Sequence, residues 1–244
     1  MKIIRAARTA PTTRRTLLRA SAATAAAGVL AAGSSPVGAT PRTPAAPLAR
    51  PTTPAAALKE LAAGNRRWRT LRQRHPHEAV AVRNSLVSGQ APFALILGCI
   101  DSRVPPELVF DQGLGDLMTV RSAGEVLDEA VLGSIAYGVL ELGIPLVVVL
   151  GHQSCGAVAA AVHAEETGEH LPTHIQYVAD QIRPAIDHAH HGPARVDATV
   201  SAQVRLVRNR LAREADLAAQ VAAGKLAVVG ARYELNTQLV HRID

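Results

Sequence analysis

Aromatic side chains are scarce in this chain of 244 residues, where Phe, Trp and Tyr together make up 2% of the sequence. Hydrophobic residues still reach 48%, which is ample for a packed core. That core must therefore be built from Ala, Val, Leu and Ile. No internal repeat recurs at a fixed period, and the length is that of one or two domains.

Acidic residues are absent from the first 39 positions, which carry six Lys or Arg. Taking these six from the 26 Lys and Arg of the whole chain leaves 20, equal to the 20 Asp and Glu. The formal net charge of +6 therefore belongs to the N-terminal segment, and the rest of the chain is formally neutral. A neutral body offers no basic face, so we expect no nucleic-acid partner.

A long apolar run is also missing from residues 1–39, whose layout is that of an export signal. A basic region ends in Thr13 to Arg19 (TRRTLLR), which resembles the twin-arginine export signal. The uncharged, Ala-rich run from Ala20 to Ala32 follows, and Val37-Gly38-Ala39 offers small residues at the cleavage positions. We predict a twin-arginine signal peptide over residues 1–39, cut after Ala39. An uncleaved anchor or a disordered basic tail is the alternative.

The predicted location is therefore outside the cytoplasmic membrane: periplasmic, in the cell wall or extracellular. The uncharged run is too short and too weakly apolar for a membrane span, and no cysteine lies near the cleavage site to carry a lipid. We expect no stable membrane anchor after cleavage. Residues 40–54 are rich in Pro, Thr and Ala and predict an extended linker, so the folded domain is predicted over residues 55–244.

Within that domain, short apolar runs alternate with helical patterns. This alternation predicts an α/β fold with a mostly parallel central sheet covered by helices. The predicted strands are 93–97, 117–120, 145–150 and 226–229, and the predicted helices are 54–73, 107–110, 128–142, 156–163 and a single long one at 196–220. In the predicted helix at 54–73, Gly64-Asn65 interrupt the apolar spacing. Its basic run is either a solvated or subunit-contacting face or an anion-binding patch (Arg66, Arg67, Arg69, Arg72 and Arg74).

Cysteine occurs only twice, and both cysteines follow predicted strands. Cys99 comes just after the first strand, while His152 and Cys155 come just after the third. The carboxyl ends of parallel strands are where open α/β sheets carry their sites. Thiolate and imidazole are the ligands that zinc prefers, and a catalytic zinc takes three protein ligands and keeps one open position. These three residues therefore predict a catalytic zinc site.

A disulfide between the two cysteines, or a pair of inert buried thiols, is the alternative. Neither accounts for Asp101 and Arg103, which stand beside Cys99, nor for His152. Ser102 and Ser154 have no paired general base, which makes a serine hydrolase a poor interpretation.

The motif Cys99-x-Asp101-Ser102-Arg103 and the motif Gly151-His152-x-x-Cys155-Gly156 together resemble those of the β-class carbonic anhydrases. The resemblance runs from about Leu58 to Val240 and thus covers nearly all of the folded body. Further matching segments are Gly64-Asn65-Arg66, Arg121-Ser122-Ala123-Gly124 and Gly230-Ala231-Arg232-Tyr233.

This resemblance implies a zinc lyase, a carbonic anhydrase (carbonate dehydratase), with one Zn²⁺ per chain. It would hydrate CO2 reversibly to bicarbonate and a proton by attack of zinc-bound hydroxide. The resemblance also implies that the protein is a homodimer or a higher homo-oligomer.

The resemblance implies as well that Cys99, His152 and Cys155 bind the zinc and that Asp101 and Arg103 form a catalytic dyad. In some members of the family the aspartate becomes a fourth metal ligand, so Asp101 could take either part.

The expected substrate-binding residues are Ser122, Ala123, Gly124 and Gly151. The sequence departs from the usual family pattern at Ser122 and Glu125, where Asn is common.

Two other functions remain open from the sequence. One is hydrolysis of CO2-like molecules such as COS or CS2 on the same scaffold, and the other is a non-catalytic, exported zinc-binding protein. The segment 163–191 is also rich in histidine. We interpret these histidines as scattered over surface helices, with a second metal site as the alternative.

Overall fold

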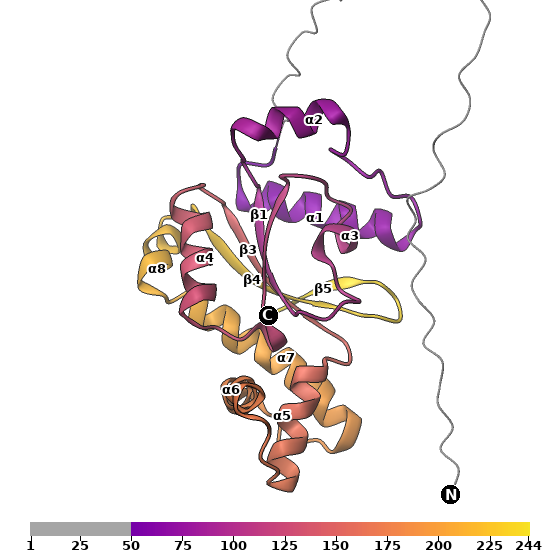
Figure 1. The fold of residues 1–244 in the computed structure, drawn as a ribbon, viewed down its shortest axis with the longest axis vertical. Helices are drawn as coiled ribbons and strands as arrows, with labels where there is room; N and C mark the ends of the chain where they lie inside the picture. Colours follow the sequence, from indigo (N-terminus) through magenta and orange to yellow (C-terminus); the bar gives the residue numbers. More distant parts are fainter. Residues whose placement is uncertain (1–49) are drawn as a thin grey trace, which may run out of the picture. The chain divides into compact units, whose positions relative to one another are not determined.

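The computed structural model describes residues 50–244; the predicted signal peptide and most of the linker lie outside the described residues. A five-stranded sheet in the order β2-β1-β3-β4-β5 forms the centre of these residues (Figure 1). Four neighbouring strands are parallel, and the last is antiparallel to β4. The predicted mostly parallel sheet is confirmed. The strands are β1 (Ala94–Gly98), β2 (Leu117–Arg121), β3 (Leu146–His152), β4 (Ala227–Tyr233) and β5 (Val240–Ile243).

Helices cover both faces of the sheet, so the central strands β1 and β3 are buried along their whole length. Successive side chains of a strand point to opposite faces. In β1, Leu95 and Leu97 pack with α4, α7 and α8 on one face, whereas Ala94 and Ile96 pack with α1 and α3 on the other. The helices are α1 (Pro54–Arg69), α2 (Val80–Ser85), α3 (Pro106–Val109), α4 (Glu129–Leu140), α5 (Gly156–Thr167), α6 (Thr173–Ile182), α7 (Gly192–Leu211) and α8 (Ala215–Ala222), with short 3₁₀ turns η1 (Leu86–Ser88), η2 (Ala123–Glu125) and η3 (Arg183–Ala185).

The strand order places a crevice between the ends of β1 and β3. The chain leaves β1 for β2 on one side and then returns to β3 on the other side of β1. The connections that follow β1 and β3 therefore diverge, and this switch point is where open α/β sheets bind ligands. Gly98 pairs with Leu150 in the register of the two strands, so Cys99 and Gly151 emerge side by side.

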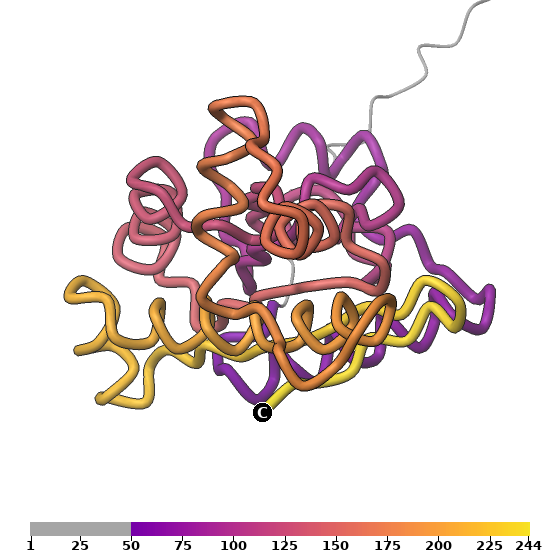
Figure 2. Tube along the Cα trace, turned by 90° about the horizontal axis from the view of Figure 1, so that it is seen from below, coloured from indigo at the N-terminus to yellow at the C-terminus, as the bar shows by residue number. Residues whose placement is uncertain are grey.

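Beyond this edge, α5 and α6 pack against each other as a helical hairpin (Figure 2). Their buried residues Val158, Ala161 and Ile182 share a small apolar cluster with Cys99 and Cys155. The sequence predicted α5 but not α6, which lies in the segment rich in histidine. None of the helices in residues 50–244 has both the length and the apolar character needed to cross a bilayer.

The single long helix predicted at 196–220 is wrong, because the chain forms α7 and α8 there. Leu211 and Leu217 are both buried in the same core cluster. On one straight helix, residues six positions apart point about 120° apart, so both could not face that cluster. Glu214 adopts an extended conformation (φ −58°, ψ 136°) at the start of α8 and redirects the chain.

Gly64 and Asn65, which interrupt the apolar spacing of the predicted first helix, lie inside α1 and are buried. A Cβ added at Gly64 would lie 1.7 Å from the carbonyl oxygen of Phe110, so glycine allows α1 to approach α3. The Asn65 amide donates to the carbonyls of Val109 (3.1 Å) and Gln238 (2.9 Å) and accepts from the amide of Val240 (2.9 Å). These residues dock the helix rather than break it.

Substitution Gly64→Ala should therefore destabilise the protein by about 1–3 kcal/mol, the usual cost of overpacking, despite the better helix propensity of alanine. The matched control is Gly133→Ala in α4, where an added Cβ meets nothing within 4 Å. There the change should stabilise by roughly 0.5–1 kcal/mol. Urea unfolding of both variants measures the difference, and equal stabilities would contradict the close approach of α1 to α3.

Candidate metal centre

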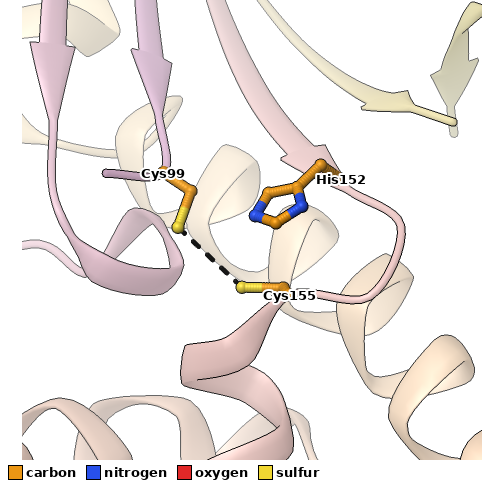
Figure 3. Close-up of side chains that lie close together, drawn as sticks. All are labelled: Cys99, His152 and Cys155. Carbon is orange, nitrogen blue, oxygen red and sulfur yellow. Dashed lines mark hydrogen bonds between the residues drawn. The ribbon is translucent and has the colours of Figure 1, made fainter. Parts of the chain in front are cut away.

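Three side chains converge at the crevice between β1 and β3 (Figure 3). Cys99 follows β1, His152 is the last residue of β3, and Cys155 is the N-cap of α5. One ligand atom from each lies within 4.8 Å of the other two, and all three residues are buried. The geometry confirms that the residues predicted as zinc ligands come together.

The sulfur positions fit a shared metal ion and not a disulfide. Both cysteines are free, and their Sγ atoms lie 3.9 Å apart. A disulfide bond is about 2.05 Å long. Two sulfurs at about 2.3 Å from one tetrahedral zinc lie roughly 3.8 Å from each other. The described arrangement is therefore not the disulfide that was the alternative from the sequence.

His152 presents its Nε2 atom to the same point. Its Nδ1 lies 2.9 Å from the carbonyl oxygen of Gln153, which can only accept a hydrogen bond, so Nδ1 carries the proton. This contact leaves the lone pair on Nε2, as is usual for metal-binding histidines. Nε2 is buried and has no hydrogen-bond partner among the described residues. Such an orphaned buried nitrogen is costly unless a ligand satisfies it, so the three residues fit a metal ion.

The two thiols titrate as a pair. The hydrogen bond from Cys155 holds the pKa of Cys99 at about 4 against the opposing effect of burial, and the amide of Gly124 donates a further hydrogen bond. The same interaction with Cys99, reinforced by burial, raises the pKa of Cys155 far above its ordinary value. The apo site therefore holds one thiolate and one thiol, and binding of a divalent metal should release the proton of the second.

Asp101 is bound to Arg103 and lies outside the group of three. The Arg103 guanidinium donates to both carboxylate oxygens, at 2.9 and 2.6 Å, and its amide donates to Oδ1 at 2.9 Å. Chiefly because of the Arg103 side chain, the pKa of Asp101 is lowered to about 2. A depressed carboxyl pKa stabilises the fold above the ordinary value of about 3.9. That contribution is lost as the pH falls through about 2.

Of the two parts predicted for Asp101, the described arrangement is the pair with Arg103. Its Oδ2 still lies 3.8 Å from His152 Nε2, so the carboxylate borders the metal position without occupying it.

Arg121, Gly124 and Gln203 also shape the site through hydrogen bonds that were not predicted from the sequence, although Gly124 was expected to bind substrate. The Arg121 guanidinium donates to the carbonyl of Cys99 at 2.8 Å and to that of Asp101 at 2.7 Å. The Gly124 amide donates to Cys99 Sγ at 3.4 Å, and the Gln203 amide donates to the Gly124 carbonyl at 3.0 Å. Gln203 comes from α7 and carries no local sequence signal for this contact.

Of the four expected substrate-binding residues, Gly124 donates its amide to Cys99, and the other three differ in their surroundings. Ala123 lines a cavity of about 420 Å³ together with Cys99 and Asp101. The Ser122 hydroxyl donates to the Val126 carbonyl at 2.7 Å, which is a turn contact. Gly151 packs against α7, where an added Cβ would lie 2.5 Å from Val204.

Apart from His174, the rest of the cavity wall is apolar and suits a small uncharged molecule. It is lined by Ile100, Gly156, Ala157, Ala160, His174, Ile175, Val178 and Ala179.

Glu125, where the sequence departs from the family pattern, is a buried acid behind the metal position. Its backbone is left-handed (φ 54°), and the residue is 1% exposed. Burial raises its pKa well above the ordinary value, and the nearby Cys99 thiolate adds to this. Burial therefore disfavours the charged form of this carboxyl group beside the Cys99 thiolate.

The histidine-rich segment does not form a second metal site. Cys99, His152 and Cys155 are the one group of His, Cys, Asp or Glu in residues 50–244 that could hold a metal ion. Histidines of this segment instead pair with acids on the surface: His163 with Glu169, His188 with Glu165 and His190 with Asp187. All six histidines of the segment are exposed, but only His163 and His174 lie in helices, so the prediction that they lie on helices is wrong for the others (His170, His188, His190 and His191).

Comparison with known proteins gives a consistent result. The family model described as carbonic anhydrase matches residues 94–240. The chain is 44% identical over 187 residues to carbonic anhydrase 2 of Mycobacterium tuberculosis, covering 76% of this chain and 90% of that protein.

Solved structures of the same class have the same fold. The β-carbonic anhydrase CcaA matches with a TM-score of 0.63 at 22% identity, over 77% of this chain and 95% of that one. The Coccomyxa β-carbonic anhydrase in complex with acetazolamide matches with a TM-score of 0.59 at 26% identity, over 76% and 86%.

Zinc should stabilise the folded chain through the three ligands. Free zinc at 100 times its dissociation constant should add about 2.7 kcal/mol to the free energy of unfolding. Cys155→Ser should lose both this stabilisation and the bound metal, because a serine hydroxyl does not replace a thiolate ligand. Metal analysis and thermal unfolding measure both effects. Ser154→Ala is the control and should behave like the wild type; stoichiometric zinc in Cys155→Ser would contradict the site.

Proposed function

The chain belongs to the β-class carbonic anhydrases, which are zinc enzymes that hydrate CO2, and we propose that Asp101 and Arg103 are the catalytic pair beside a zinc held by Cys99, His152 and Cys155. The observation that carries this proposal is the meeting of two sulfurs and one imidazole within 4.8 Å at the end of the sheet. These three residues leave a fourth position on a tetrahedral metal free for water.

Bound zinc lowers the pKa of water so that hydroxide is available near neutral pH. The residues of the chain orient this chemistry. Ionised Asp101 can only accept hydrogen bonds, so it holds the proton of the reacting water and turns an oxygen lone pair toward CO2. Arg103 keeps the carboxylate ionised and in place. The apolar cavity wall around Ala123 receives the CO2 molecule.

A charge argument gives Arg103 a second effect. Asp101 without its arginine would be free to approach the metal. Its carboxylate would then be a third anionic ligand beside the two thiolates and would take the position that water needs. Arg103 thus favours the arrangement in which the site is open.

Arg103→Ala should lower the kcat/KM for CO2 hydration by about 100-fold, the usual cost of losing a preorganised charged contact at a reacting centre. Stopped-flow hydration with a metal assay measures this, and zinc content should stay at the wild-type level. Without Arg103, the pKa of Asp101 should also rise from about 2 toward its ordinary value. The matched control is Arg183→Ala, which removes an exposed pair with Asp180 (2.6 Å). Full activity in Arg103→Ala would contradict a catalytic role for Arg103.

We further propose that the protein acts outside the cytoplasmic membrane as a homo-oligomer. Export is supported by the basic, uncharged and small-residue regions of residues 1–39. Oligomerisation is supported by a cavity of about 430 Å³ whose apolar lining includes Leu58 and Leu61 of α1 and Val240 of β5. A second copy of the chain would cover this surface, which is bordered by Arg66, Arg69 and Arg242.

Export through the twin-arginine route should yield a mature chain that begins at Thr40. Mass spectrometry of the protein from outside the cytoplasmic membrane measures its first residue. Replacing both Arg14 and Arg15 with Lys should leave the uncut chain inside the cell. Equal export of this variant, or a mature chain that still contains residues 1–39, would contradict the predicted signal.

A further inference from the structure

Hydration of CO2 releases one proton for every bicarbonate formed, and that proton must leave the site before the next turnover. The inference below rests on this reaction. Two of the three titratable side chains on the wall of the cavity at this site already have partners. Arg103 binds both carboxylate oxygens of Asp101, and Cys99 is a proposed metal ligand.

His174 is the remaining titratable side chain on the wall of the 420 Å³ cavity that Cys99 and Asp101 also line. The rest of that wall is made of Ile, Ala, Val and Gly side chains. Histidine is the side chain whose ordinary charge change falls between about pH 5 and 8. It is therefore the residue type suited to accept a proton at neutral pH and release it again.

His174 is also free to move between the cavity and solvent. It lies in the first turn of α6 and is exposed. Within residues 50–244 its ring has no hydrogen bond or ion pair, unlike His163, which pairs with Glu169 at 3.3 Å. The facing part of α5 presents only Gly156, Ala157 and Ala160 to the cavity, so neither bulk nor charge from that helix blocks the ring.

The cavity has room for a chain of water molecules between the metal position and this histidine. One water takes about 30 Å³ of liquid volume, and the cavity measures about 420 Å³. Proton transfer through such a chain requires no direct contact between His174 and the reacting water.

We propose that His174 is the proton acceptor that carries the product proton of CO2 hydration from the cavity to solvent. The oxygen of the reacting water forms a bond to the carbon of CO2, while one C=O π bond opens and its electron pair moves onto that CO2 oxygen. One O–H bond of the reacting water breaks, so that bicarbonate and one proton result. The neutral imidazole of His174 takes this proton through intervening water and becomes imidazolium. It then gives the proton to a buffer base, which restores the neutral ring.

The first test is stopped-flow CO2 hydration by His174→Ala at low buffer concentration. Proton transfer follows the release of bicarbonate, so its loss lowers kcat and leaves kcat/KM unchanged. We expect kcat to fall by about 10-fold or more, as for loss of an acid–base group. Added imidazole should restore kcat in the variant and change the wild type little. Unchanged kcat, or an equal fall in kcat/KM, would overturn the proposal.

The matched control is His163→Ala, which removes an exposed histidine from the neighbouring helix α5, away from this cavity. Its kcat should equal that of the wild type, and both variants should keep wild-type zinc content and thermal stability. These measurements also separate the role of His174 from the proposed function. Absence of CO2 hydration in the wild type would refute the proposed function, whereas unchanged kcat in His174→Ala would refute only the role of His174.

A second readout does not depend on activity. In protein loaded with paramagnetic Co²⁺, the ring NMR signals of His174 should be broadened by the nearby metal, whereas those of His163 should remain sharp. Subtracting the spectra of the two alanine variants assigns the signals. Sharp His174 signals in the Co²⁺ protein would place the ring too far from the metal and would overturn the proposal.

Discussion

The parallel pairing of β1 with β3 is the constraint on which the rest of the site depends. It brings two chain segments about fifty residues apart into register, with Gly98 opposite Leu150. Each strand is buried on both faces, so neither can shift without exposing its aliphatic side chains. The ligands after the strands therefore inherit the rigidity of the core. A zinc site needs such fixed positions, because its donors must meet within a few ångströms.

Around these ligands, hydrogen bonds from backbone and second-layer side chains fix what the strands alone would leave loose. Arg121 binds the carbonyls on both sides of Ile100, and the amide of Gly124 supports the Cys99 sulfur. Gln203 in turn holds the Gly124 carbonyl. This network joins η2 and α7 to the end of β1, so the site is supported from elements that provide no metal ligand themselves.

The sequence predicted the sheet and the metal ligands because both leave local signals. Aliphatic runs mark buried strands, and Cys99, His152 and Cys155 stand directly at strand ends. The contacts of Gln203 and Asn65 could not be predicted, because their partners are distant in the sequence. Gly124 lies 79 residues from Gln203, and Gln238 lies 173 residues from Asn65. The break between α7 and α8 was missed for a similar reason. No Gly or Pro stands between Leu211 and Leu217 to mark the break, and only their shared core cluster requires the bend.

The 3.9 Å separation of the two free sulfurs makes the metal-free protein sensitive to oxidation. A shift of roughly 2 Å would bring them to bonding distance. In an oxidising compartment, metal-free chains are thus exposed to a dead-end oxidation that would destroy the donor set. Zinc acts in this setting as a protecting group for the thiolates. If the chain is exported as proposed, zinc binding before export protects the ligands from oxidation. The order of metal loading and transport then determines the fraction of exported protein that is active.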